Sequence, residues 1–389
     1  MNSRYQNLKD ILKNESCFKM ICGAGNEDCE QVEKLAFIYT LAGATILDIS
    51  ANVEVVKAAK RGIDKALESM VDNRYIRPYI MVSIGMPGDH HVRKSYIDPF
   101  KCIGCGLCAP VCPTEAIPNG FEKNLIYFQE LNGTFEIPNP AKEIVIKDLC
   151  IGCGKCSNIC PKDDIISYRH SERELRELLP KCMEAGAELF ELHAAVGDEE
   201  VTMKEWKLIN EINPHNFNSM CLDRLNLGNL NLEHRIQKAK EISGDKLIIQ
   251  ADGYPMSGGE DNYNTTLQAI STADIINKKF NMRLDKTQVS KDGKKQLSKL
   301  AYRPHGSRQG VYIVLSGGTN SKSRELANLT GVRCNGVAIG TFARNIIDDL
   351  IQDKHFLSSN VFISFALIKA KELVDKNNIK YKEEDDYSG

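Results

Sequence analysis

The sequence predicts an α/β protein in which a (β/α)8 barrel-like domain carries an inserted, cysteine-rich module. Two observations predict this fold. Strand-like segments alternate with amphipathic helices, three strands before the module and five after it, and eight β/α units are the number that closes a barrel. Within the module, the run C-x2-C-x2-C-x3-C-P occurs twice, ending at Pro113 and at Pro161, a spacing typical of bacterial two-cluster ferredoxins. The alternative is an open doubly wound sheet with the same insertion.

The two cysteine runs predict the ligands of two 4Fe-4S clusters. Cysteines at intervals of three residues can wrap one cubane, because each thiolate reaches a different iron, and the cysteine before the proline then ligates the other cluster. One cluster is therefore assigned to Cys102, Cys105, Cys108 and Cys160, and the second to Cys150, Cys153, Cys156 and Cys112. The runs also contain glycines where a Cβ would obstruct the approach of the backbone to a sulfide, namely Gly104, Gly106, Gly152 and Gly154. All-cysteine zinc sites are the alternative, but they usually use two separated C-x2-C pairs.

Composition describes an ordinary cytoplasmic protein. Of 389 residues, 42% are hydrophobic and 26% are charged, and the net charge of -2 gives no electrostatic reason to expect nucleic acid. The N-terminus has no apolar signal core, and the apolar run at 361–368 is far shorter than the ~18 residues that span a bilayer. We expect no membrane span and a reducing compartment. There the remaining cysteines are free thiols, namely Cys17, Cys22, Cys29, Cys182, Cys221 and Cys334.

The first part of the chain, residues 1–94, is predicted to form the first three strands of the barrel. Apolar segments at 18–24, 45–49 and 78–84 are interpreted as buried strands, and residues 27–42 and the stretch after Asn52 show helical spacing. The module occupies residues 95–168. Its long stretch between the two cysteine runs predicts an extra hairpin with strands at 125–129 and 143–147.

Residues 169–355 are predicted to complete the barrel. Strands are expected at 187–193, 218–222, 246–250, 311–315 and 336–339, and helices at 171–185, 201–212, 232–242 and 264–279. Ser171 is the expected N-cap of the first of these helices, and Pro180 a possible site of kinking. The lysine-rich stretch 281–310 predicts a long exposed excursion.

Residues 356–389 are predicted to form a final helix and a disordered acidic tail. Four large apolar side chains recur at roughly helical spacing and predict the face by which this helix docks on the domain. They are Phe356, Val361, Phe365 and Ile368.

Glycines follow the last two predicted strands. Gly317 and Gly318 lie in the sequence SGGTN, and Gly340 and Thr341 follow the next strand. Barrels bind phosphate at these two strand ends, because bare backbone amides and a helix N-terminus can meet the anion there. The pattern therefore makes these residues candidates for a phosphate or flavin site, although glycines that only form tight turns are the commoner outcome.

Other polar residues lie at predicted strand ends, where barrel enzymes place their catalytic groups. They are Cys22, Asp48, Ser83, His193, Asp252 and the loop of Ser257, Gly258 and Gly259. His193 is a candidate general base, although a packed structural histidine is the commoner outcome. Cys22 is a candidate reactive thiol, although a buried inert thiol is the commoner outcome. His90 and His91 are interpreted as a polar loop, with metal ligation as the alternative.

The wording and order of several segments resemble the light-dependent-period (LdpA) proteins of cyanobacteria. The resemblance is carried by FKMICGAGNEDCEQVEKLAFIYTLAGATILDIS, the doubled cysteine runs, QADGYPMSG, LSGGTN and GVAIGTFAR, and it covers most of residues 16–349. It implies an iron-sulfur protein that reports cellular redox state to the circadian clock, adjusts the period with light and associates with protein partners of the clock input pathway. Only the eight cysteines of the runs carry a role over from the family.

Two functions compete on this evidence. The first is a redox sensor whose clusters change oxidation state or are lost and thereby alter the conformation and partner binding of the barrel. It requires no catalytic residues, and the sequence contains no convincing catalytic constellation. The second is a flavin-containing or phosphate-ligand-binding barrel oxidoreductase fed with electrons by the two clusters. A plain electron carrier would leave the barrel without a purpose.

Overall fold

A computed structural model describes residues 3–70, 76–86, 89, 94–119, 144–146, 149–150, 153–163, 165–168, 172–256, 258–284, 300–302 and 310–379. The chain divides into two compact units. One comprises residues 1–83 and 178–389, and the other comprises residues 84–177. The predicted module, residues 95–168, lies within the second unit.

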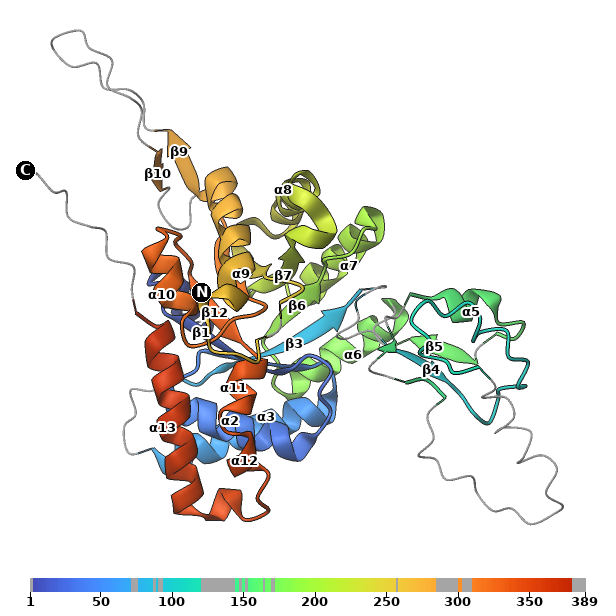
Figure 1. Ribbon diagram of the computed structural model, residues 1–389, viewed down its shortest axis with the longest axis horizontal. Coiled ribbons are helices and arrows are strands. Elements are labelled where there is room, and N and C mark those ends of the chain that lie inside the picture. Colours follow the sequence, from blue (N-terminus) through green and yellow to red (C-terminus); the bar gives the residue numbers. More distant parts are fainter. Residues whose placement is uncertain are drawn as a thin grey trace, which may run out of the picture. The chain divides into compact units, whose positions relative to one another are not determined.

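The first unit is a closed barrel of eight strands (Figure 1). Its strands, in the order in which they neighbour one another, are β1 (Cys17–Gly23), β12 (Gly336–Ile339), β11 (Tyr312–Ser316), β8 (Leu247–Asp252), β7 (Asn218–Asp223), β6 (Leu189–His193), β3 (Tyr79–Gly85) and β2 (Ile46–Ser50). The pairings recorded residue by residue are parallel, and β1 pairs with both β2 and β12. The barrel is therefore confirmed, and the open doubly wound sheet is wrong.

Helices connect successive strands. They are α2 (Cys29–Ala42), α3 (Val53–Ser69), α6 (Glu172–Ala185), α7 (Glu199–Ile212), α8 (Arg224–Ser243), α9 (Tyr263–Ile276), α10 (Ser323–Leu329), α11 (Thr341–Asn345), α12 (Asp348–Ile351) and α13 (Asn360–Asn377). Short polar side chains cap several of them. Asp28, Asn52 and Asp198 each accept backbone N–H bonds at the start of α2, α3 and α7, which satisfies donors that have no partner inside a helix.

Sequence reasoning missed a helix that precedes the first strand. Helix α1 (Ser3–Lys13) buries Leu8 and Leu12 in a core cluster formed by residues at the first positions of the strands, among them Ile46, Tyr79 and Ile248. Helix α1 therefore covers the barrel at the amino ends of its strands. The helix was easy to miss in the sequence because only two of its side chains, Leu8 and Leu12, are fully buried, and two residues make a weak periodic pattern.

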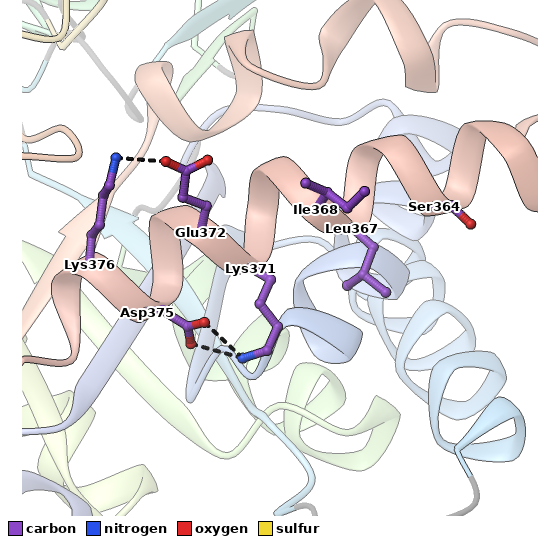
Figure 2. Close-up of a pocket in the computed structure, with 7 residues that line it drawn as sticks. All are labelled: Ser364, Leu367, Ile368, Lys371, Glu372, Asp375 and Lys376. Atoms are coloured by element: carbon purple, nitrogen blue, oxygen red, sulfur yellow. Dashed lines mark hydrogen bonds and ion pairs between the residues drawn. The ribbon is translucent and has the colours of Figure 1, made fainter.

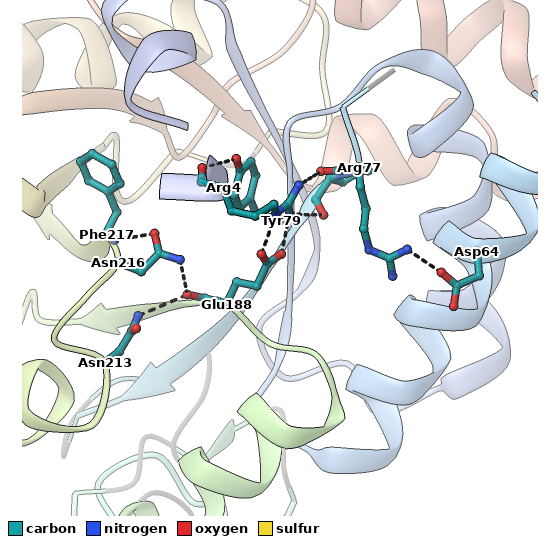
Figure 3. Close-up of polar contacts among 9 residues, drawn as sticks. Arg4, Asp64, Arg77, Tyr79, Glu188, Asn213, Asn216 and Phe217 are labelled. Atoms are coloured by element: carbon teal, nitrogen blue, oxygen red, sulfur yellow. Dashed lines mark hydrogen bonds and ion pairs between the residues drawn. The ribbon is translucent and has the colours of Figure 1, made fainter. Parts of the chain in front are cut away.

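Arg4 fastens α1 to the barrel, as Figure 3 shows. Its guanidinium contacts Glu188 at 2.8 and 2.5 Å and donates to the Arg77 and Pro78 carbonyls. It also lies 3.7 Å from the centre of the Tyr79 ring, whose hydroxyl donates to the Arg4 carbonyl at 2.6 Å. One side chain thus joins α1 to the segments that begin β3 and β6.

Two segments differ from their predictions. The stretch 281–310 contains a short antiparallel pair, β9 (Met282–Leu284) with β10 (Leu300–Tyr302), and Asn281 closes its base by bonding to the backbone N–H and carbonyl of Val311. Helix α8 begins earlier than predicted, at Arg224, and is broken at Gly228, where φ is 67°. A glycine with positive φ cannot continue a right-handed helix. The helix predicted at 232–242 therefore corresponds only to the part of α8 that follows Gly228.

The predicted docking face of the last helix is wrong. Helix α13 forms as expected, but Val361, Phe365 and Ile368 are 61%, 56% and 64% exposed. The buried residues are Ala366, Ala370, Leu373, Val374 and Asn377. The small side chains of Ala366 and Ala370 allow α13 to pack closely against α2 and α10. The buried face of α13 is therefore the one that permits close helix packing, and not the one with the largest apolar side chains. Phe356, in a separate 3-10 turn (Phe356–Ser358), is fully buried.

The second unit contains a two-stranded antiparallel sheet, β4 (Ser95–Ile97) with β5 (Ile166–Tyr168), and a short helix, α5 (Lys155–Ile159). Its core is a cluster that includes Cys108, Cys150 and Cys156 with Ile97, Ile117 and Ile165. Thiols therefore make up part of the core itself. The predicted extra hairpin falls largely, and Ser171 entirely, outside the described residues. Pro180 lies within α6.

Candidate iron-sulfur centre and barrel mouth

Six of the eight cysteines of the two runs belong to one apolar core or pack against it. Three of them, Cys108, Cys150 and Cys156, belong to the core, and Cys102, Cys112 and Cys160 pack against it. Cys105 is exposed and Cys153 partly buried. A set of thiols in an apolar shell that limits access of water is the environment that iron-sulfur clusters require.

The glycines inside the runs adopt backbone conformations that favour glycine. Gly104, Gly106 and Gly154 have φ values of 65°, 72° and 85°. In this left-handed region an L side chain is strained, and glycine is not. Glycine at these three positions therefore allows the tight loops to form without backbone strain. Gly152 lies outside the described residues.

Thiols of the two cysteine runs influence one another's pKa. Burial raises the pKa of Cys102, and the neighbouring sulfurs of Cys105 and Cys160 raise it further. Burial likewise raises the pKa of Cys108 to about 11, with contributions from the sulfurs of Cys102 and Cys156. The pKa values of Cys102 and Cys108, in the first run, are therefore raised by thiols of the second run as well as by their own neighbours. A bound iron would remove this penalty, because metal coordination deprotonates the thiol.

Cys112 has a different surrounding. Burial raises its pKa, but the backbone N–H groups of Thr114, Ile117 and Ala116, together with the Thr114 hydroxyl, stabilise the thiolate and lower the pKa overall. Cys150 accepts a hydrogen bond from the Ser95 N–H at 3.3 Å. Both sulfurs are thus provided with donors, as ligands of a negatively charged cluster would be.

The donor set fits 4Fe-4S clusters. A cubane takes one thiolate on each of four irons, so its ligands need not converge on one point. Among the described residues, no three Cys, His, Asp or Glu side chains converge on a position for a single metal ion. When bound, such clusters take up and release one electron at a time. The surrounding residues hold the thiolates, supply hydrogen bonds to them and keep an apolar shell around them.

Residues 92–166 match the protein family described as a 4Fe-4S dicluster domain. The second unit contains a ferredoxin-like 4Fe-4S domain. The fold prediction for this part of the chain is confirmed, and the iron-sulfur character of the protein with it.

A wider comparison extends beyond this domain. The curated protein "Light dependent period A" of Synechococcus elongatus is 29% identical over 244 residues, which are 62% of this chain and 61% of that protein. The match therefore spans less than two thirds of the relative. The resemblance predicted from the sequence is confirmed. Among solved structures, the YdjI aldolase of Escherichia coli K12 aligns over 97% of this chain and 96% of its own, with a TM-score of 0.44 and 8% identity.

The barrel interior carries an ion-pair network that sequence reasoning did not identify. Lys19 on β1 contacts Glu191 on β6 at 2.6 Å, Asp48 on β2 at 2.9 Å and the Gln250 side chain on β8 at 2.7 Å. Ser219 donates to the same Glu191 oxygen at 2.7 Å. Barrel interiors are usually filled by branched apolar side chains. The only sequence signal for this network is a single polar residue in an apolar strand, because both neighbours of Lys19 on β1 are apolar. That signal does not indicate which residues Lys19 contacts.

Two of the predicted strand-end residues belong to this network. Ser83 donates to Asp48 at 2.7 Å. Burial raises the pKa of Asp48, opposed by Lys19. Burial also acts to raise the pKa of Glu191, but Lys19, His193 and the Ser219 hydrogen bond together lower it overall. Lys19 itself is held in the charged state, because its two carboxylates overcome the effect of burial and raise its pKa. A permanently charged lysine cannot act as a nucleophile.

His193, Cys221 and Asp252 lie together nearer the carboxyl ends of the strands, which we call the barrel mouth. His193 pairs in register with Cys221 across β6 and β7. Its Nε2 lies 3.7 Å from the buried Glu191 carboxylate. The Cys221 thiol donates to Asp252 at 3.4 Å. These residues come from three strands, and the sequence had nominated His193 and Asp252 separately.

The thiols at the barrel mouth are weaker acids than ordinary cysteines. Burial and the nearby Asp48 raise the pKa of Cys22 to about 12, and burial with Asp252 raises the pKa of Cys221 well above its usual value. Cys22 lies at an irregularity in the pairing of β1 with β2. Reactive cysteines need a depressed pKa, so the geometry favours the inert alternative for both.

The predicted phosphate glycines have tight packing around them. A Cβ on Gly317 would lie 2.2 Å from the Asp252 carboxylate, and one on Gly318 would lie 2.0 Å from the Thr265 carbonyl. Both have positive φ. Gly340 is near Ile21 and Arg344, and Arg344 approaches the Thr341 hydroxyl at 3.4 Å while donating to the Ile21 carbonyl. Turn geometry and close packing explain Gly317 and Gly318 without a ligand, and a flavin there stays a prediction from the sequence.

The other sequence candidates are only partly described. His90, His91 and Ser257 lie outside the described residues. A Cβ on Gly258 would lie 3.2 Å from the Thr319 carbonyl, so Gly258 lies beside the SGGTN turn. Figure 2 shows a surface groove lined by α13 itself, including Leu367 and Ile368, with the pairs Lys371–Asp375 and Glu372–Lys376 along it. No helix in the described ranges is long and apolar enough to cross a bilayer.

Proposed function

We propose that this protein is an iron-sulfur redox sensor of the light-dependent-period type, which relays cellular redox state to protein partners of the circadian clock input. The observation that carries the proposal is the combination of a 4Fe-4S domain at 92–166 with similarity to Light dependent period A over 244 residues. In this proposal the domain holds two clusters. The first is bound by Cys102, Cys105, Cys108 and Cys160, and the second by Cys150, Cys153, Cys156 and Cys112.

The thiols of Cys160 and Cys156 each raise the pKa of a cysteine in the first run, which supports a site to which both runs contribute. In sequence Cys160 follows the second run, but its sulfur interacts with a thiol of the first. Exchange of the fourth ligand between runs is what the C-P spacing predicts. It also binds the two clusters into one folding unit, because loss of either would remove a ligand loop from the other.

The chemistry of the barrel supports a sensor over a catalyst. Lys19 is locked in an ion pair, the mouth thiols Cys22 and Cys221 are held protonated, and Gly318 is packed against Thr265. Side chains that are paired with one another, or held protonated, stabilise the fold. They are poorly suited to act as nucleophiles or general bases on a substrate. A sensor needs only a barrel whose stability or surface changes when the attached domain changes state.

The test begins with anaerobic purification and the joint measurement of iron, acid-labile sulfide and flavin. The proposal expects about eight irons and eight sulfides for each chain, the content of two cubanes, and no flavin in the supernatant after denaturation. Stoichiometric flavin would instead support the barrel oxidoreductase predicted as the alternative. Protein without labile sulfide would contradict both.

A second experiment tests sensing itself. Hydrogen exchange of the barrel peptides is measured with the clusters reduced, oxidised and removed, together with binding to the clock input proteins of the same organism. The proposal expects exchange in the barrel and partner affinity to differ among the three states. Identical exchange and identical affinity in all three would overturn the sensor role while leaving the clusters in place.

A further inference from the structure

The first strand of the ferredoxin-like domain contacts a predicted cluster ligand directly. The Ser95 N–H donates to the Cys150 sulfur at 3.3 Å, and the Ser95 hydroxyl lies 3.5 Å from the same sulfur. Ser95 is 5% exposed and Cys150 6%. Lys94 also donates to the Cys150 carbonyl at 2.8 Å. Lys94 and Ser95, which precede Cys150 by 56 and 55 positions, thus contact both the backbone and the side chain of this first cysteine of the second run.

A second hydroxyl reaches another predicted ligand. The Thr114 Oγ1 lies 3.8 Å from the sulfur of Cys112, which precedes it by two residues. In the proposed ligand sets, Cys112 and Cys150 bind the same cluster. Hydroxyl groups from two separate segments of the chain, β4 and the loop after Pro113, therefore lie against sulfurs of one cluster.

The direction of these bonds is fixed once iron is bound. A cysteine that ligates iron is a thiolate without a proton, so the serine and threonine hydroxyls can only donate to it. An electron that enters a cluster increases the negative charge on its sulfurs, and a hydrogen bond to an anion strengthens with that charge. Such donors therefore stabilise the reduced state more than the oxidised state.

We propose that the hydroxyls of Ser95 and Thr114 raise the reduction potential of the cluster bound by Cys112, Cys150, Cys153 and Cys156. They are positioning residues that set the redox range over which this cluster changes state. The inference rests on the proposed function, since it requires two clusters with exchanged fourth ligands. It adds that two specific hydroxyls, on different segments, act on the same cluster.

The test is a redox titration of anaerobic protein with dithionite and mediators, followed by EPR that resolves the two clusters. Ser95→Ala removes the hydroxyl and keeps the backbone N–H, and Thr114→Val removes a hydroxyl at nearly constant shape. Each variant is expected to lower the potential of the same cluster, decreasing its reduced-to-oxidised ratio at fixed ambient potential by up to about tenfold, or ~59 mV for one electron. The double variant is expected to shift it further.

Two variants serve as matched controls. Tyr96→Phe removes a hydroxyl from the next residue of β4, where the side chain is 50% exposed, and both potentials should stay unchanged. Ser95→Thr keeps the hydroxyl and should restore a potential near that of the unmodified protein. If Ser95→Ala loses iron, Thr114→Val carries the test, because Thr114 is only partly buried.

The outcomes separate this inference from the function on which it rests. Unchanged potentials with full iron and sulfide would overturn the inference and leave the two-cluster sensor standing. Shifts in two different clusters would overturn it together with the exchanged ligands. Fewer than two clusters in the unmodified protein would contradict the proposed function before any variant is made.

Discussion

Lys19 and Glu191 are 172 positions apart in the sequence and form an ion pair of 2.6 Å inside the barrel, where neither side chain is more than 2% exposed. Asp48 completes the arrangement at 2.9 Å from the same ammonium group. One positive charge therefore stabilises two carboxylates, one on β2, before the ferredoxin-like domain in the chain, and one on β6, after it. This pairing joins the two segments of sequence that the ferredoxin-like domain separates.

Replacement of Lys19 should destabilise the barrel strongly. Lys19→Met leaves two buried carboxylates without their countercharge, and removing one partner of a buried ion pair costs about 3–5 kcal/mol. The free energy of unfolding, measured by urea titration, should fall by this amount. Lys57→Met is the control, because Lys57 is 52% exposed and pairs with an exposed Glu54, so its loss should cost about 0.5 kcal/mol or less. Equal effects of the two substitutions would contradict the account.

Replacement of Cys112 should damage the cluster of the other run. Cys112→Ser is expected to alter or remove the EPR signal of the cluster held by Cys150, Cys153 and Cys156, because the cysteine before the proline ligates the opposite cluster. Cys160→Ser should affect the first cluster in the same way, consistent with the effect of the Cys160 thiol on the pKa of Cys102. Damage confined in each case to the cluster of the variant's own run would overturn the exchanged assignment.

Gly318 should be needed for packing. Gly318→Ala places a Cβ 2.0 Å from the Thr265 carbonyl at a φ of 72°, and we expect a loss of about 1–3 kcal/mol from strain and displacement. Gly197→Ala is the control, since nothing lies within 4 Å of its added Cβ, and it should change stability by less than about 0.5 kcal/mol. A neutral Gly318→Ala that abolished flavin or phosphate binding would instead favour the ligand-site interpretation.

The thiols of the barrel mouth should resist alkylation in the folded protein. The pKa of Cys22 is raised to about 12 and that of Cys221 well above normal, so at pH 7–8 both are protonated, and the thiolate is the reactive form. Iodoacetamide labelling read by mass spectrometry should modify the partly exposed Cys29 well before either of them. Labelling of Cys22 as fast as Cys29 would show that an open form of the barrel is populated.

Local sequence patterns predicted the secondary structure well where one face of an element is buried. All eight barrel strands were expected within a few residues of their observed bounds, because short apolar runs bounded by glycine or polar turns have few other outcomes in an α/β chain. Helix α1 was missed because its buried face is small. The docking face of α13 was mispredicted because large apolar residues were taken as buried, whereas Ala366 and Ala370 allow the closer helix contact.

The candidate sites also differ in how far the sequence predicts them. The cysteine spacing alone identified the iron-sulfur domain, since three ligands of each cubane come from one short loop and leave a fixed interval in the sequence. No comparable interval marks the barrel interior. Lys19, Glu191 and Gln250 each look like an isolated polar residue in an apolar strand, and they form a network only because the closed sheet brings β1, β6 and β8 around one axis.

The sequence by itself determined the doubled cysteine motif, the eight strands and the point at which the ferredoxin-like domain interrupts them, because each depends on residues close together in the chain. Only the tertiary structure decided which polar side chains meet, which thiols are held protonated and which hydroxyls lie on a cluster ligand. Contacts such as Ser95 with Cys150 and Lys19 with Glu191 join residues 55 and 172 positions apart. The spacing of residues in the sequence does not indicate such contacts, since burial and distance are properties of the folded chain.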